Sequence, residues 1–85
     1  MDLEDVFCSK TRVKILKLLF QCGQLNTSSV AKRLRTNYGA ASRHLALLEE
    51  EGVVAQRLSG KTRFFRFTNT MKAQAVVKLL GEWEQ

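Results

Sequence analysis

The sequence predicts an α+β domain in which three helices are followed by a two-stranded β-hairpin and a C-terminal helix. Three observations support this fold class. Apolar residues recur at helical spacing in four segments, two short β-prone runs lie between the third and fourth segments, and glycines stand at the boundaries. Because 85 residues leave room for one hydrophobic core only, residues 1–85 are expected to form a single domain.

The first two helices are predicted from their apolar stripes. The first runs from about residue 3 to residue 21 and is ended by Gly23. Its stripe consists of Ile15, Leu16, Leu19 and Phe20. The second should begin near Thr27 or Ser28, where a hydroxyl can cap free backbone N–H groups. Its apolar side consists of Val30, Ala31 and Leu34.

A third helix is predicted over residues 38–51. Thr36 and Asn37 interrupt the pattern of the second helix, and Asn37 is expected to cap the third. The core side of this helix carries Ala41, Leu45 and Leu48 at spacings i, i+4 and i+7. Gly52 should close it as a left-handed C-terminal cap.

The hairpin is predicted from the runs 53–58 and 62–67, joined by Ser59, Gly60 and Lys61. The alternation of a strand puts Arg63, Phe65 and Phe67 on one face. The last helix should begin at Asn69 or Thr70, and its apolar stripe consists of Val76, Leu79, Leu80 and Trp83.

Charge points to a polyanion as the partner. Fourteen Lys and Arg against eight Asp and Glu give a net charge of +6. Many of the cations lie in the central part of the chain, whereas most acids lie near its ends. This arrangement predicts a basic binding face. No run is long enough for a membrane span and no signal peptide opens the chain, so a cytoplasmic protein without a membrane partner is expected.

The second and third helices, with a tight turn between them, predict a helix-turn-helix, and the hairpin after them predicts a winged helix-turn-helix. In this motif the start of the second of the two helices enters the major groove of double-stranded DNA. Its expected DNA-contacting residues are Asn37, Tyr38, Gly39, Ser42 and Arg43. Arg43 can donate to guanine or to a phosphate, and Gly39 allows a close approach. The alternative is a solvated helix face without a ligand.

The hairpin tip and the start of the second helix add further candidate contacts. Lys61 and Arg63 could lie along phosphates or enter the minor groove, or belong to a solubilising turn. Arg57 could contact a phosphate or be an ordinary outward strand position. Thr27 and Ser28 lie at a helix N-terminus that suits a phosphate, although capping explains them equally well.

The sequence resembles ArsR-type winged helix-turn-helix regulators over nearly its whole length. The likeness is carried by Thr11-Arg12 to Ile15-Leu16, Val30-Ala31 with Leu34, Ser42-Arg43-His44-Leu45, Leu47-Leu48-Glu49, Gly52-Val53-Val54 and the run 60–67. The resemblance implies a dimer formed by the terminal helices, operator binding near a promoter, and Ser42 and Arg43 at the DNA. Many relatives sense metals. This chain has no converging set of ligands, so no metal, cofactor or small-molecule effector is expected.

The terminal helices, about 1–21 and 69–85, are the expected dimerisation elements. Their candidate residues are Leu3, Val6, Phe7, Val76, Leu79, Leu80 and Trp83. The last stripe could instead pack back on the first helix. Cys8 and Cys22 are too far apart on one continuous helix for a disulfide, so reduced thiols or a bridge across a dimer are the alternatives. His44 is expected to be a partly buried structural imidazole.

The sequence therefore predicts a homodimeric, sequence-specific transcriptional regulator, a repressor, without enzymatic activity. Two other functions stay open. A winged helix can serve as a protein-interaction module of a larger transcription assembly, and a basic domain can bind DNA or RNA without sequence preference.

Overall fold

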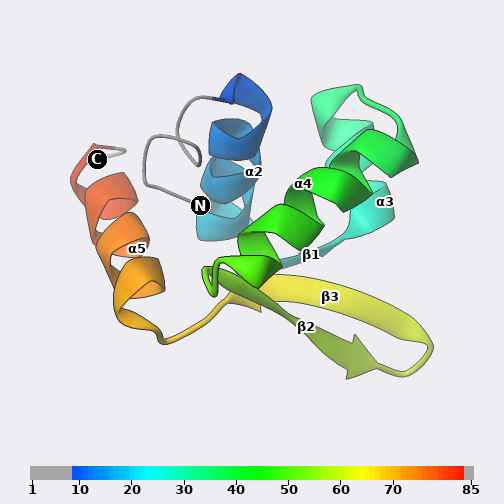
Figure 1. Ribbon diagram of the computed structural model, residues 1–85. Helices are drawn as coiled ribbons and strands as arrows, with labels where there is room; N and C mark the ends of the chain where they lie inside the picture. Colours follow the sequence, from blue (N-terminus) through cyan, green and yellow to red (C-terminus); the bar gives the residue numbers. More distant parts are fainter. Residues whose placement is uncertain (1–8, 84–85) are drawn as a thin grey trace.

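The computed structural model describes residues 9–83 and confirms the winged helix-turn-helix (Figure 1). In chain order its elements are α2 (Lys10–Cys22), β1 (Gln24–Asn26), α3 (Thr27–Leu34), α4 (Tyr38–Glu50), β2 (Val54–Ser59), β3 (Thr62–Phe67) and α5 (Met71–Trp83). Figure 1 shows α5 at one side of the molecule and the β2–β3 hairpin extending from the other side. The described part holds no helix long and apolar enough to cross a membrane.

The first described helix is shorter than predicted. Ser9 has an extended backbone (φ −95°, ψ 119°), and its side chain accepts a hydrogen bond from the Arg12 N–H at 3.3 Å. A side chain in that position is an N-cap, so α2 begins at Lys10 and a continuous helix through Ser9 is wrong. Gly23 ends α2 as predicted, with φ +84°. The candidate dimer residues Leu3, Val6 and Phe7, and also Cys8, lie outside the described residues.

The sheet has three strands instead of the predicted two. Its order is β1-β3-β2, and both pairings are antiparallel. The additional strand β1 pairs Leu25 with Phe65, and both side chains are buried. The three residues of β1 are too few to show the alternating pattern of a strand. They form a strand only because they pair with β3, which lies far along the chain. Since β3 is central, β2 is an edge strand.

The turn of the hairpin is one residue shorter than predicted. Ser59 pairs with Thr62, which leaves Gly60 and Lys61 as a two-residue loop. Gly60 has φ +63° at the first loop position, the conformation that glycine supplies in tight hairpins. The shorter loop shifts the cross-strand register by one residue. As a result Gln56 lies opposite Phe65, on the face turned toward the core.

Local capping fixes the ends of α3 and α4. The α3 cap is the side chain of Asn26, which accepts from the Ser29 N–H at 2.7 Å, and not a hydroxyl of Thr27 or Ser28. Asn37 caps α4 as predicted. Gly52, with φ +82°, follows α4, and the bonds from its N–H to the Glu49 carbonyl and from the Val53 N–H to the Leu48 carbonyl complete a Schellman end.

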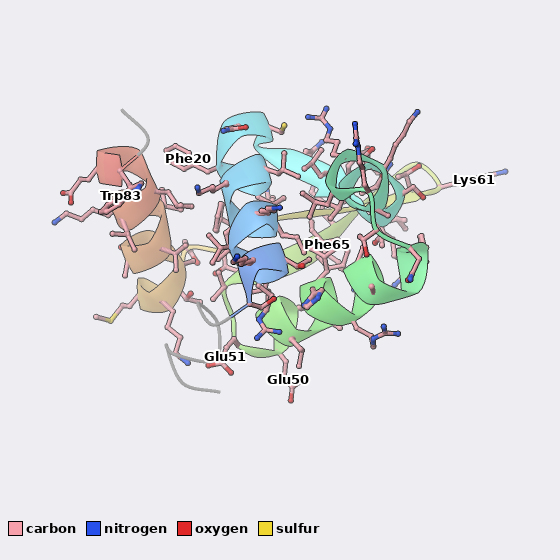
Figure 2. All side chains as sticks on the ribbon, turned by 90° about the horizontal axis from the view of Figure 1, so that it is seen from above. Phe20, Glu50, Glu51, Lys61, Phe65 and Trp83 are labelled. Atoms are coloured by element: carbon pink, nitrogen blue, oxygen red, sulfur yellow. The ribbon has the colours of Figure 1, made fainter. Side chains whose placement is uncertain are left out.

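The core lies between the helices and the inner face of the sheet. Its members at 0 % exposure are Ile15, Leu16, Leu19, Val30, Ala41, Leu45, Leu48 and Ala73. The last helix divides its predicted stripe between two environments. Val76 and Leu80 are buried in this core, whereas Leu79 and Trp83 are exposed. Phe20 fills the space between α2 and α5, where it lies over Gly81 (Figure 2).

Candidate nucleic-acid interface

The helix α4 has a core side and a free side, as its helical spacing predicts. Ala41, Leu45 and Leu48 anchor it in the core. On the free side Tyr38 is 60 % exposed, and Gly39, Arg43 and Ala46 are also exposed. A Cβ built on Gly39 would lie 3.6 Å from Arg43 Nη1, so this guanidinium reaches back along the first turn of α4. The free side combines a long cationic donor, Arg43, with the small residues Gly39 and Ala46.

The N-terminus of α4 is held by Asn37. Its Oδ1 accepts a hydrogen bond of 2.7 Å from the Ala40 N–H, which satisfies one of the free donors of the first turn. The predicted DNA contact at Asn37 therefore competes with a capping role that the structure shows. The other free N–H groups of this turn suit an anion.

The turn between α3 and α4 contains a backbone feature that sequence reasoning missed. Arg35 is in the left-handed region (φ 54°, ψ 44°), and its N–H contacts the carbonyls of Ala31 and Lys32 at the end of α3. It is the one non-glycine residue of the described chain with positive φ. Glycine or asparagine usually occupies such a position, so an arginine there gives no signal of the turn.

A polar cleft of about 490 Å³ lies between the start of α3, the start of α4 and the hairpin. It brings together six of the predicted DNA-contacting residues, which are Thr27, Ser28, Tyr38, Ser42, Lys61 and Arg63. Thr27 contributes least surface because it is 9 % exposed. Figure 2 shows Lys61 at the tip of the hairpin, extending away from the body of the molecule. Three separate elements thus place polar and cationic groups around one concave surface.

Sequence reasoning missed several residues of this cleft. Asn26, Gln56, Thr62 and Phe65 also line it. Gln56 was missed because the predicted three-residue loop would pair it with Phe64, on the opposite face of the sheet from Phe65. The glycine in the loop was the signal for a two-residue turn, and this turn gives the observed register.

Arg57 does not line the cleft. It pairs with Phe64, and the alternation along β2 places both on the face of the sheet turned away from the core. Arg66 of β3 shares that face, since it pairs with Ala55. The interpretation of Arg57 as an ordinary outward strand position fits this geometry.

The hairpin is tied to α4 by a chain of side-chain hydrogen bonds. Glu49, near the end of α4, accepts from the Gln56 backbone N–H at 3.2 Å and from Gln56 Nε2 at 3.0 Å. Arg63 Nη1 in turn donates to Gln56 Oε1 at 3.4 Å. This chain of hydrogen bonds connects α4 to a cation of the hairpin.

His44 lies at the junction of α2 and α4. Arg12 Nη1 is 3.3 Å from His44 Nδ1, which places the accepting nitrogen of a neutral imidazole toward the guanidinium. Partial burial, followed by the charges of Arg12 and Arg43, lowers the pKa of His44 below its ordinary value of 6.5. The imidazole is half-buried and hydrogen-bonded, as predicted.

Metal-binding residue types do not converge in the described part of the chain. Residues 9–83 contain no group of three or more His, Cys, Asp or Glu that could hold an ion. Cys22 is an exposed free thiol whose Sγ lies 3.4 Å from Arg33 Nη1.

Comparisons with known proteins agree with this geometry. A family model described as bacterial regulatory protein, arsR family, matches residues 9–56. The arsenical resistance operon repressor of Escherichia coli (strain K12) is 32% identical over 82 residues, covering 96% of this chain and 69% of that protein. The transcriptional activator HlyU of Vibrio cholerae serotype O1 is 31% identical over 78 residues, covering 92% and 70%. The solved structure of HlyU from Vibrio cholerae N16961 matches with a TM-score of 0.79 at 27% identity, covering 95% of this chain and 86% of that chain.

Proposed function

We infer the function of this chain from the family to which it belongs, the ArsR family of bacterial regulatory proteins, whose members are DNA-binding, non-enzymatic regulators of transcription. We propose that it is a sequence-specific repressor that binds double-stranded DNA as a homodimer in the cytoplasm. The observation that carries this proposal is the cleft shared by α3, α4 and the hairpin, with its polar and cationic lining.

In the proposed complex the start of α4 lies in the major groove. Arg43 reads a guanine through its forked donors, and Tyr38 and Ser42 donate to base edges or phosphates. Gly39 lets the helix approach closely. The exposed Lys61 at the hairpin tip lies on the backbone or in the minor groove, together with Arg63. Ser28 lies where the DNA backbone would pass the start of α3.

The dimer is proposed to form through the outer face of α5. Met71, Ala75, Leu79 and Trp83 follow one another at i+4 spacing and are all exposed, with Met71 at 86 % and Trp83 at 79 %. A chain of this size gains stability by covering such a stripe with a second copy. Val76 and Leu80, expected at the dimer contact, instead belong to the chain's own core. Trp83 and Lys61 lie at opposite ends of the molecule (Figure 2), so a dimer through α5 leaves both hairpins free.

The test is selection of binding sites from a randomised duplex pool, followed by affinity measurements for the selected sites at several salt concentrations. We expect a two-fold symmetric site with half-sites about one helical turn apart. Salt-sensitive binding without enrichment would support an architectural protein, and no binding at low salt would support a protein-interaction module. A reporter placed behind the selected site separates repression from activation.

Two variants test the proposed roles of Arg43 in reading a base and of Lys61 in binding the DNA backbone. Arg43→Ala should cost about 1–3 kcal/mol of binding free energy and relax the preference at one base pair. Lys61→Ala should weaken all sequences about equally and reduce the salt dependence. Lys14→Ala removes the same charge from an exposed position of α2, which does not line the cleft, and serves as the matched control. An unchanged site preference in Arg43→Ala would contradict its assignment to base reading.

A further inference from the structure

We propose that Glu49 is the positioning residue of the hairpin, and that through Gln56 it holds Arg63 at the cleft in the orientation in which it meets DNA. This inference rests on the proposed function, because it names a residue that prepares a contact of the same interface. Glu49 itself lies at the end of α4 away from the residues that would enter the groove.

Gln56 lies on β2, an edge strand of the sheet. An edge strand has alternate N–H groups without a partner strand. Glu49 Oε2 accepts the Gln56 backbone N–H at 3.2 Å, so the carboxylate occupies a place that a further strand would otherwise take. The bond ties the backbone of β2 directly to a side chain of α4.

The side-chain amide of Gln56 lies between the Glu49 carboxylate and the Arg63 guanidinium. A carboxylate can only accept hydrogen bonds and a guanidinium can only donate them. An amide between the two satisfies both in one orientation only, with Nε2 donating to Glu49 at 3.0 Å and Oε1 accepting from Arg63 at 3.4 Å. The chain carboxylate–amide–guanidinium therefore has a fixed direction, and its charged ends strengthen it.

Arg63 keeps N–H donors for a further partner. A guanidinium has five N–H groups, and Gln56 takes one of them. Arg63 lines the cleft beside Lys61 and Thr62. Holding it there before DNA arrives lowers the conformational entropy lost on binding. Glu49 thus strengthens binding although its own charge repels DNA.

The neighbouring acids do not share this arrangement. Glu50 is exposed and points away from the body of the molecule (Figure 2), and Glu51 Oε1 is 2.7 Å from Lys72 Nζ of α5. Glu50→Ala is therefore a matched control, since it removes the same charge from the same helix end without touching the chain to Arg63.

The experiment is a double-mutant cycle between Glu49→Ala and Arg63→Ala, measured as affinity for the selected operator at several salt concentrations. We expect Arg63→Ala to lower the affinity for the operator at least about three-fold more in the wild-type background than in the Glu49→Ala background. Glu49→Ala should also reduce the salt slope by about 1, whereas Glu50→Ala should leave it unchanged. Equal effects of Arg63→Ala in both backgrounds would overturn the proposal.

Two further measurements separate this inference from the fold and from the proposed function. Gln56→Leu keeps the size of the side chain but can neither donate to Glu49 nor accept from Arg63, so it should reproduce the uncoupling without adding a charge even if Glu49→Ala folds poorly. Hydrogen exchange of the backbone N–H of Gln56 needs no DNA. Because Glu49 accepts this N–H, we expect it to exchange faster in Glu49→Ala than in Glu50→Ala. Should the wild-type chain bind no DNA, the proposed function fails, while unchanged exchange would refute the role of Glu49 by itself.

Discussion

Replacing Arg35 by glycine should stabilise the protein. Arg35 holds a left-handed backbone in the turn between α3 and α4. For an L-residue this conformation costs roughly 1–2 kcal/mol, and glycine removes that cost. Glycine also gives the unfolded chain more freedom, which takes back about 0.4–1 kcal/mol. The expected net gain is about 0.5–1 kcal/mol, which corresponds to a rise of about 2–8 °C in Tm for a domain of this size.

The control for this prediction is Arg35→Ala. It removes the same side chain and the same charge but keeps a Cβ in the left-handed region, so the difference between the two variants isolates the backbone. Thermal and urea unfolding followed by circular dichroism give both Tm and the free energy of unfolding. Equal stability of the glycine and alanine variants would refute the reasoning, since side-chain loss alone would then explain both.

Three other predictions concern single contacts. Gly81→Ala should raise the free energy of unfolding by up to about 1 kcal/mol, because its Cβ would lie 3.6 Å from Phe20 in ordinary contact and alanine favours a helix; a lower Tm would contradict this. Asn37→Ala should cost about 0.5–2 kcal/mol by removing the cap of α4, which urea unfolding against Asn37→Ser can check. Since the folded pKa of His44 lies below 6.5, the unfolded state binds more protons, and stability should fall as the pH drops through and below that value. His44→Asn, which keeps an acceptor for Arg12, should lose this dependence, and an unchanged pH profile would rule out the imidazole as its source.

The parts of the fold that local chemistry determines were predictable from the sequence. Asn37 and Gly52 mark the two ends of α4 because capping depends on a few neighbouring residues, and helical spacing then separates its core side from its free side. The strand β1 was not predictable, because Leu25 becomes part of a sheet only through Phe65, far along the chain. Arg35 gave no signal because its side chain does not indicate a left-handed backbone.

In the candidate site, too, features set by neighbouring residues were predictable and contacts between distant elements were not. Tyr38 and Ser42 follow from the phase of one helix, and Lys61 follows from its place in the hairpin loop. The bonds between Glu49 and Gln56 depend on the angle between the hairpin and α4 and on a register set by a single loop residue. Such a contact joins two elements whose separate patterns say nothing about each other, so only the assembled structure reveals it.

The two sides of α4 also differ in what mutation can do to them. Leu45 and Leu48 are fully buried, and a change there alters the volume of the core. Arg43 and Ala46 are exposed, and surface substitutions usually change stability by less than about 0.5 kcal/mol. Under the proposed function, substitutions on the free side would therefore change DNA preference with little effect on stability, whereas substitutions on the core side would change folding.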